Sequence, residues 1–241
     1  MTLKNKTILI TGAARRLGNA TAVYLAQQGA NLILHYNSSS AEVEVTKKAV
    51  IDLGSQCWTV QADLSNLADL SNLMKLAVSF SPIYGLINNA SLFKPLPMEQ
   101  TSLTEWENHL RVNLTAPFYL TQQFALAYNQ PEVGRVINLV DWRALRPGKD
   151  HFPYTISKSA LVALTKAAAL SLAPGITVNA IALGAILPPE NEVENPDLLK
   201  SIPLKRWAKI DEFLCAINFL LEGPEAITGE VVHLDGGRHL V

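Results

Sequence analysis

The chain has 241 residues, which is enough for one large α/β domain with a sizeable core. Hydrophobic residues make up 49% of the chain and charged residues only 17%, which favours a sheet buried on both faces and a buried oligomer interface. Twenty basic and twenty-one acidic residues leave a net charge of -1, so the charge balance gives no reason to expect nucleic acid or an anionic membrane as a partner.

Short apolar runs rich in β-branched residues alternate with longer helical patterns along the chain. This alternation predicts βαβ units, and hence a single α/β domain over residues 1–241: a Rossmann fold with a doubly wound, parallel, seven-stranded sheet flanked by helices. The predicted strands are Thr7–Thr11, Asn31–Tyr36, Cys57–Gln61, Gly85–Asn88, Val133–Val140, Ile176–Ala182 and Val231–Leu234. The predicted helices are Leu17–Gln28, Ala41–Leu53, Leu67–Phe80, Thr104–Tyr128, Pro153–Leu172 and Phe213–Leu221.

Three local features qualify this pattern. Pro117 lies within the longest helical run, where we expect a kink or absorption by local packing. The Pro- and Glu-rich stretch Ile186–Lys205 follows a predicted strand, so we expect a substrate lid over residues 186–205, with an ordinary surface loop as the alternative. Cys57 and Cys215 lie in separate apolar segments, which predicts two buried, inert thiols.

The N-terminal residues lead directly into the first predicted strand. No signal-peptide pattern precedes that strand, and no apolar run is long enough to span a bilayer. We therefore expect a cytoplasmic protein. No pattern of metal ligands stands out, and we expect no metal site.

A glycine-containing turn, T-G-A-A-R-R-L-G, follows the first predicted strand and precedes a helix. Such a turn lets a diphosphate approach the backbone at a helix N-terminus. The segment N-N-A, at Asn88–Ala90, follows the fourth predicted strand and is expected at the same edge of the sheet. Together the two segments indicate a dinucleotide site.

The end of the second predicted strand bears on the choice of cofactor. The sequence H-Y-N-S-S-S, from His35 to Ser40, lacks the acid that would hold the ribose 2′-hydroxyl of NAD. Its hydroxyl and amide donors suit the 2′-phosphate of NADPH, to which Arg15 would add charge. The serines are also expected to cap the following helix. Asp63 is expected to contact the adenine together with Leu64, and the alternative role for Asp63 is a helix N-cap.

Tyr154 and Lys158 stand four residues apart in Y-T-I-S-K, which places them on one face of a helix. A nearby ammonium favours the phenolate, so we expect Lys158 to lower the pKa of Tyr154 and make it a usable acid–base group. The same lysine is expected to reach the nicotinamide ribose. This pair is common by chance, and it gains weight from the glycine turn, from N-N-A and from Asn113 between them.

With these motifs, the chain resembles the short-chain dehydrogenase/reductase family over essentially its whole length. The family motifs are T-G-x-x-x-G-x-G, N-N-A-G, Asn, Ser and Y-x-x-x-K. Here Arg16 replaces the middle glycine of the first motif, Ser91 replaces the glycine after N-N-A, and Asp141 replaces the catalytic serine. These departures, and the segments V-Q-A-D-L-S-N, N-N-A-S-L-F and L-D-G-G-R-H-L, resemble the pteridine reductases and the bacterial dihydromonapterin reductases.

The resemblance implies a role for each matching position. The implied catalytic residues are Asp141, Tyr154, Lys158 and Asn113, the last supporting the lysine through water. The implied substrate contacts are Arg16, Ser91, Phe93, Asp141 and Tyr154, with Phe93 stacked on the pterin ring opposite the nicotinamide. The residues expected to bind the cofactor are Gly12, Arg15, Arg16, Leu17, His35, Tyr36, Asn37, Ser38, Asp63, Leu64, Asn89, Ala90, Ser91, Lys158, Gly184 and Ile186.

Other interpretations of these positions stay open. Asp141 could be a cap or surface charge, Phe93 a core residue, and Arg16 a solvated residue at a helix end. Three residues that follow Asp141 are candidates to line the pocket by proximity alone: Trp142, Arg143 and Arg146. The resemblance also implies a homotetramer, in which Arg238 and His239 reach a neighbouring subunit's site; the alternative is that both are exposed residues of the C-terminal tail.

The chemistry of Asp141 favours a pterin independently of the resemblance. A serine donates a hydrogen bond to a carbonyl that develops negative charge, whereas an ionised aspartate only accepts. An amino-heterocycle presents N–H groups that need acceptors. We therefore predict NADPH-dependent reduction of 7,8-dihydromonapterin or a related dihydropterin to the tetrahydro form. The alternatives are a carbonyl reductase, such as a 3-oxoacyl thioester reductase, and a dinucleotide-binding regulator without turnover.

Overall fold

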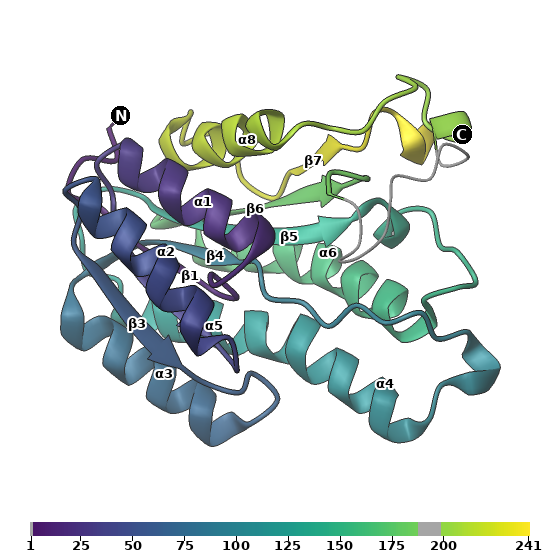
Figure 1. The fold of residues 1–241 in the computed structure, drawn as a ribbon, viewed down its shortest axis with the longest axis horizontal. Helices are drawn as coiled ribbons and strands as arrows, with labels where there is room; N and C mark the ends of the chain where they lie inside the picture. Colours follow the sequence, from purple (N-terminus) through teal and green to yellow (C-terminus); the bar gives the residue numbers. More distant parts are fainter. Residues whose placement is uncertain (1, 188–198) are drawn as a thin grey trace.

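The computed structural model describes residues 2–187 and 199–241. Within these residues a seven-stranded sheet has the order β3-β2-β1-β4-β5-β6-β7, and each neighbouring pair is parallel (Figure 1). The strands are β1 (Thr7–Ile10), β2 (Asn31–Tyr36), β3 (Cys57–Gln61), β4 (Ile83–Asn88), β5 (Gly134–Asp141), β6 (Ile176–Leu183) and β7 (Val231–Leu234). The order in which the strands are added to the sheet reverses between β1 and β4. At the C-terminal ends of the strands on either side of such a reversal, doubly wound folds bind ligands in a crevice.

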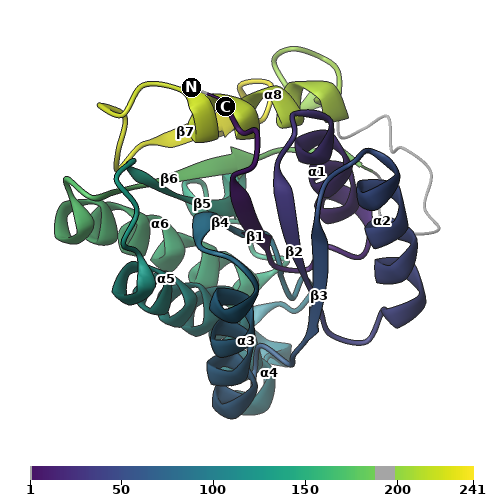
Figure 2. The same cartoon turned by 90° about the vertical axis from the view of Figure 1, so that its left-hand side faces the viewer.

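Helices cover both faces of the sheet (Figure 2). One face carries α1 (Arg16–Gln27), α2 (Ser40–Asp52) and α8 (Ile210–Glu222). The other carries α3 (Leu67–Phe80), α4 (Leu103–Leu110), α5 (Ala116–Ala127) and α6 (Phe152–Leu172). The predicted single-domain, doubly wound α/β fold is therefore confirmed.

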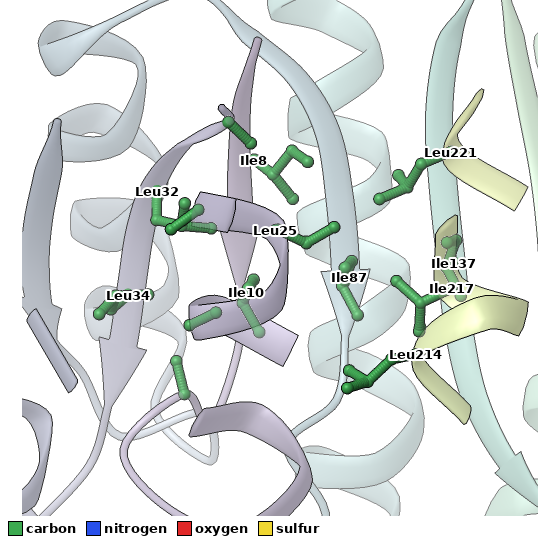
Figure 3. Packing of buried hydrophobic residues seen from close by; sticks show 14 of the residues in the cluster. Ile8, Ile10, Leu25, Leu32, Leu34, Ile87, Ile137, Leu214, Ile217 and Leu221 are labelled. Carbon is green, nitrogen blue, oxygen red and sulfur yellow. The ribbon is translucent and has the colours of Figure 1, made fainter. Parts of the chain in front are cut away.

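Packing on the α1 and α8 face fixes the position of the central strands (Figure 3). The buried side chains there include Ile8, Ile10, Leu25, Leu32, Leu34, Ile87, Ile137, Leu214, Ile217 and Leu221. Burying each such side chain contributes roughly 1.5–3 kcal/mol. This packing holds the C-terminal ends of β1 and β4 as a rigid base for the loops that follow them.

The longest predicted helix is divided by a π-helical segment, Arg111–Thr115, between α4 and α5. Pro117 stands at the start of α5, where it has no N–H to donate to the carbonyl of Asn113 four residues earlier. The wider π turn accommodates that missing bond, so the proline is absorbed locally. The same turn places Asn113 in the protein interior.

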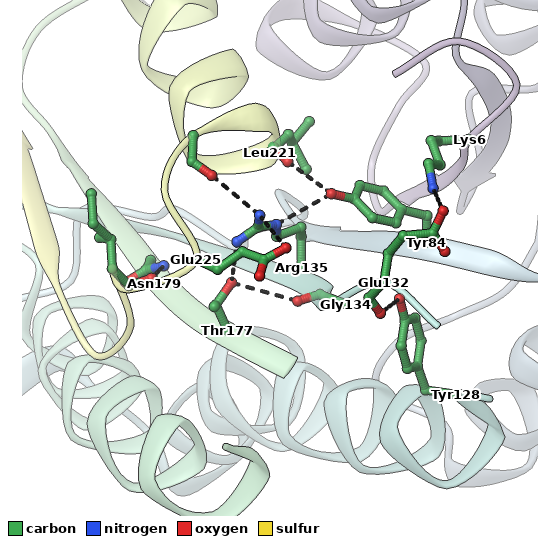
Figure 4. Close-up of polar contacts among 12 residues, drawn as sticks. Lys6, Tyr84, Tyr128, Glu132, Gly134, Arg135, Thr177, Asn179, Leu221 and Glu225 are labelled. Carbon is green, nitrogen blue, oxygen red and sulfur yellow. Dashed lines mark hydrogen bonds and ion pairs between the residues drawn. The ribbon is translucent and has the colours of Figure 1, made fainter. Parts of the chain in front are cut away.

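A buried arginine joins elements at the opposite end of the sheet from the crevice (Figure 4). Arg135, near the start of β5, is 1% exposed. Its guanidinium donates hydrogen bonds to the Tyr84 hydroxyl at 3.2 Å, to Thr177 Oγ1 at 3.3 Å and to the Gly223 carbonyl at 3.2 Å. Tyr84 in turn donates to the carbonyl of Leu221 at 3.0 Å. The end of α8 is thereby tied to β4, β5 and β6.

Two expectations about local structure need correction. Cys57 and Cys215 are both free, but Cys215 is exposed because it lies on the solvent side of α8; burial raises the pKa of the half-buried Cys57 thiol to about 12. Ser39 is the N-cap residue of α2 but makes no side-chain cap bond there, and the cap of α3 is Asn66, not Asp63.

Part of the expected lid, residues 188–198 of 186–205, lies outside the described residues. No helix in the described residues is long and apolar enough to cross a membrane. The same residues contain no group of three or more side chains that could hold a metal ion.

Candidate active site

The glycine turn between β1 and α1 is built against the N-N-A segment. Gly12 has a φ of +63°, and a Cβ there would lie 3.0 Å from the Ala90 Cα. A Cβ on Gly18 would lie 2.2 Å from the Gly12 carbonyl oxygen, which no side chain tolerates. The Asn89 side-chain amide donates to the carbonyls of Thr11 at 2.7 Å and Gly12 at 2.9 Å. The two predicted cofactor segments therefore form one wall, with a cradle that a Cβ would fill.

His35 is hydrogen-bonded through its side chain to the glycine turn at Gly12. Its side chain is 2% exposed; Nδ1 accepts a hydrogen bond from the Gly12 N–H at 3.0 Å, and Nε2 faces the Ala62 carbonyl at 3.0 Å. Burial lowers the pKa of His35 to about 4, so the ring is neutral at physiological pH. Both ring nitrogens are therefore engaged inside the protein, and the predicted cofactor contact of His35 stays a prediction.

Arg16 adopts a backbone conformation that glycine ordinarily fills. Its φ is +53°, in the left-handed region, and it is the first residue of α1. A non-glycine residue there costs roughly 1–2 kcal/mol. Arg15, the N-cap residue, and Arg16 are both exposed at the helix N-terminus, whose partial positive charge attracts anions. Leu17 is half-buried and packs on the core behind them.

The ends of β2 and β3 meet at a cavity of about 280 Å³. It is lined by Asn37, Gln61, Ala62, Asp63, Asp69 and Asn72, so two expected cofactor positions from different strands share it. Asn37 and Ser38 are exposed, and the Tyr36 carbonyl accepts from the Ala62 N–H at 3.0 Å. Leu64 is buried directly after Asp63.

Three predicted catalytic side chains converge at the end of β5. Asp141 is the last residue of that strand, and Tyr154 and Lys158 face it from α6. The Asp141 carboxylate lies close enough to the Tyr154 hydroxyl to raise the pKa of that hydroxyl. The Lys158 ammonium donates to the Leu139 carbonyl at 2.8 Å and lies 5.8 Å from the centre of the Tyr154 ring.

The electrostatics of this trio differ from the sequence-based expectation. The pKa of Tyr154 is raised well above its ordinary value, first by burial and then by the Asp141 carboxylate. Burial also lowers the pKa of Lys158 to about 8 and raises the pKa of Asp141. The expectation that Lys158 lowers the pKa of Tyr154 is therefore wrong, because burial and the Asp141 carboxylate raise that pKa. Tyr154 remains protonated and is a hydrogen-bond donor.

Asp141 also caps the short 3-10 helix Trp142–Ala144 by accepting from the Arg143 N–H at 2.8 Å. The Arg143 guanidinium lies 3.7 Å from the same carboxylate. Asp141 therefore has the capping role that was its alternative interpretation, and it also lies beside Tyr154.

Asn113 connects the catalytic helix to the loop after N-N-A. Its amide nitrogen donates to the Leu92 carbonyl at 2.9 Å and to Ser157 Oγ at 3.0 Å. Its amide oxygen accepts from the Leu92 N–H at 2.7 Å and from Ser91 Oγ at 3.3 Å. The Asn113 side chain thus positions the loop that bears Ser91, while its expected support of Lys158 through water stays a prediction.

Phe93 is exposed on 51% of its surface, so the alternative of simple core packing is wrong. Its ring stacks on His151 with centroids 4.3 Å apart and meets Tyr154 edge-on at 4.7 Å. His151 Nδ1 lies 3.0 Å from the Asp150 carboxylate, which also binds the Arg143 guanidinium at 3.1 Å. Sequence reasoning missed Asp150 and His151; His151 is the N-cap residue of α6, three residues before Tyr154.

The remaining predicted residues follow the C-terminal ends of β6 and β7. Gly184 donates its N–H to the Leu234 carbonyl at 2.9 Å, and a Cβ on Gly184 would lie 2.7 Å from the Asp235 Cα. Ile186 is buried. Arg238 stacks over Trp142 with its guanidinium carbon 4.0 Å from the ring centre, and His239 Nδ1 lies 2.8 Å from the Asp235 carboxylate. Both C-terminal residues therefore contact their own subunit.

Both a family model and a relative from another organism match this chain over almost its whole length. A family model described as enoyl-(acyl carrier protein) reductase matches residues 12–239. The 3-oxoacyl-[acyl-carrier-protein] reductase of Synechocystis sp. is 32% identical over 240 residues, which cover 98% of this chain and 97% of that protein.

Two solved structures agree with this result. FolM alternative dihydrofolate reductase 1 from Brucella suis, in complex with NADP, has a TM-score of 0.90 and 36% identity, over 98% of this chain and 96% of that one. A short-chain dehydrogenase/reductase from Serratia marcescens has a TM-score of 0.92 and 31% identity, over 99% of this chain and 100% of that one.

Proposed function

The chain belongs to the short-chain dehydrogenase/reductase family of oxidoreductases, and within it we propose that this protein is an NADPH-dependent reductase of a dihydropterin, such as 7,8-dihydromonapterin. The product is the corresponding tetrahydropterin. The observation that carries the proposal is the Asp141 carboxylate at the end of β5, beside Tyr154 and in the position where a carbonyl reductase of this family has serine.

The residues of the glycine turn fit a nicotinamide dinucleotide. Gly12, with its left-handed backbone, leaves room for a diphosphate at the N-terminus of α1, and Arg15 and Arg16 stand beside it. Asn37 and Ser38 are exposed donors at the end of β2, which suit a 2′-phosphate, and the FolM structure was solved with NADP. When bound, the cofactor supplies hydride.

The chain's own residues supply the proton and hold the heterocycle. Tyr154 keeps its proton because of burial and of Asp141, and so it can deliver that proton to a ring nitrogen once hydride reaches the neighbouring carbon. Asp141 accepts from ring and exocyclic N–H groups, which a ketone lacks. The exposed face of Phe93 is available for stacking on the pterin.

A 3-oxoacyl thioester reductase is the second candidate, because the Synechocystis relative carries that name. Reduction of a ketone develops negative charge on oxygen, which needs a hydrogen-bond donor beside it. Asp141, which accepts from the Arg143 N–H and lies beside Tyr154, would face that oxygen with negative charge. The carboxylate therefore favours the dihydropterin.

The test is steady-state oxidation of NADPH by the full chain with 7,8-dihydromonapterin, 7,8-dihydrobiopterin, 7,8-dihydrofolate and a 3-oxoacyl thioester in parallel, and with NADH as the cofactor control. We expect fast turnover of a dihydropterin with NADPH and none of the thioester. Turnover of the thioester alone would overturn the proposal. Asp141→Ser should abolish pterin reduction, and unchanged pterin turnover in that variant would contradict the acceptor argument.

The implied homotetramer is part of the same proposal, and light scattering after size-exclusion chromatography measures it directly. A monomer in solution would contradict the family resemblance on this point.

A further inference from the structure

The loop that carries Phe93 is anchored to the protein on both sides of that residue. On one side, the Leu92 N–H donates to the Asn113 amide oxygen at 2.7 Å, and the Leu92 carbonyl accepts from the Asn113 amide nitrogen at 2.9 Å. On the other side, the Leu96 carbonyl accepts from the Phe152 N–H at 2.8 Å, at the start of α6. The backbone position of Phe93 is therefore set by Asn113 and by the first turn of the catalytic helix.

The Phe93 ring packs on the side chain of His151. The two rings are nearly parallel, with centroids 4.3 Å apart and planes at 16° to each other, so the imidazole covers one face of the phenyl ring. Tyr154 contacts the same ring edge-on, with centroids 4.7 Å apart. Phe93 is nevertheless 51% exposed, which leaves the face opposite His151 open to a ligand.

His151 is itself held by backbone and side-chain contacts. It is 9% exposed and is the N-cap residue of α6, where its carbonyl accepts from the Thr155 N–H at 2.8 Å. Its Nδ1 lies 3.0 Å from the Asp150 carboxylate, which also binds the Arg143 guanidinium at 3.1 Å. Turning the imidazole would move Nδ1 away from that carboxylate. His151 is therefore the fixed member of the stacked pair.

A continuous series of contacts thus connects the two side chains to which the proposed function assigns the pterin ring. Arg143 lies 3.7 Å from the Asp141 carboxylate and 3.1 Å from that of Asp150. Asp150 in turn contacts His151, which stacks on Phe93. In the proposed function Asp141 accepts from N–H groups at the edge of the pterin, and Phe93 covers its face. The placement of the carboxylate relative to the phenyl ring decides whether one flat heterocycle can make both contacts.

We infer that His151 is a positioning residue for the substrate, because it holds the Phe93 ring in the plane on which a flat heterocycle stacks. The inference rests on the proposed function and deepens it by naming what sets the selectivity for a planar ring. A side chain held in one orientation before binding loses less conformational freedom when the ligand arrives, so the ligand binds more tightly. The expected complex is a stack of three rings in the order pterin, Phe93 and His151.

The experiment is a double-mutant cycle on the full-length protein. Wild type, His151→Gln, Phe93→Leu and the double variant are assayed for kcat and KM with 7,8-dihydromonapterin, and for NADPH affinity by fluorescence titration. His151→Gln removes the ring and keeps a polar side chain beside Asp150, whereas His151→Phe keeps a ring for stacking and removes the polar contact. His233→Gln is the matched control, because the exposed His233 imidazole stacks on a different ring, that of His239, with centroids 3.9 Å apart.

We expect His151→Gln to raise the KM for the dihydropterin roughly two- to tenfold, which is the range that the loss of one aromatic pair predicts. Both kcat and the NADPH affinity should stay unchanged in this variant, and His233→Gln should match the wild type throughout. His151→Phe should keep the wild-type KM. The double variant should have the KM of Phe93→Leu, because His151 acts through the ring that Phe93→Leu removes.

Three results would overturn the inference while leaving pterin reduction intact. An unchanged KM in His151→Gln would show that the imidazole does not position the substrate site. Additive increases in the double variant would show that His151 acts by a route other than Phe93. Equal increases in His151→Phe and His151→Gln would show that the stacked ring is not the feature that matters. If the wild type does not reduce the dihydropterin, the proposed function fails, and this inference fails with it.

Discussion

We expect acid to weaken the glycine turn through His35. The neutral ring accepts from the Gly12 N–H through Nδ1, so a proton on Nδ1 would remove that acceptor and place a positive charge in the core. His35→Leu is the matched perturbation, because it fills similar space and has no titrating group. The variant leaves the Gly12 N–H and the Ala62 carbonyl without the ring as a partner.

The magnitudes follow from these contacts. Each unpaired backbone group costs roughly 1–3 kcal/mol, so His35→Leu should be less stable than the wild type at pH 7.5 by a few kcal/mol. Burial lowers the pKa of His35 from 6.5 to about 4, which corresponds to about 3 kcal/mol. Between these two pH values the unfolded chain binds the proton and the folded protein does not, so wild-type stability falls as pH drops from 6.5 to 4.

Urea unfolding of both proteins at several pH values between 7.5 and 4 measures this effect. The difference in the free energy of unfolding between wild type and His35→Leu should shrink by about 3 kcal/mol across the range, because only the wild type has this titration. The affinity for NADPH at pH 7.5 should be lower in the variant. A stability difference that is constant with pH would refute the assignment of His35 as a neutral acceptor.

The remaining predictions concern the catalytic wall and the helix start. Tyr154→Phe should lower kcat for a dihydropterin by roughly 10²–10⁴-fold with NADPH affinity retained, and an unchanged kcat would exclude Tyr154 as proton donor. Asp150→Asn, at an exposed position, weakens the contacts to Arg143 and His151, so it should raise the pterin KM several-fold without lowering the melting temperature. Lys149→Gln is the control. An equal KM in the two variants would contradict the role of Asp150 in positioning Arg143 and His151. Arg16→Gly should change the free energy of unfolding by no more than about 1 kcal/mol, because relief of the left-handed strain offsets the added freedom of the unfolded chain. The same variant should bind NADPH more weakly. Undiminished affinity for NADPH would show that Arg16 does not contact the cofactor.

The sequence predicted the fold and the meeting of the catalytic trio for one physical reason. In a parallel sheet the C-terminal ends of neighbouring strands share an edge, so a residue that ends β5 lies beside the loops after β4 and β6. Asp141 and Asn89 are placed in this way by strand order alone. Tyr154 and Lys158 follow on the next helix, and their spacing of four puts both on the face that meets Asp141.

The sequence could not predict which way some side chains point or in which direction the pKa values of the site residues shift. Both faces of β2 are covered by helices, so its hydrophobic pattern does not show which way His35 points. The pKa of Tyr154 depends on how deeply the ring is buried and on the Asp141 contact, which are properties of the assembled site. The pairing of Asp150 with Arg143 and His151 depends on the path of an irregular loop, which has no periodicity to read.

The buried Arg135 bears on the order in which the protein is completed during synthesis. Its acceptor at Gly223 lies 88 positions later in the sequence, and the Leu221 carbonyl that accepts from the Tyr84 hydroxyl lies 137 positions after Tyr84. Until α8 has emerged, a nascent sheet that buried Arg135 would hold a charge short of partners, which is strongly unfavourable. Full burial of Arg135 is therefore linked to the docking of the end of α8, which supplies these two acceptors.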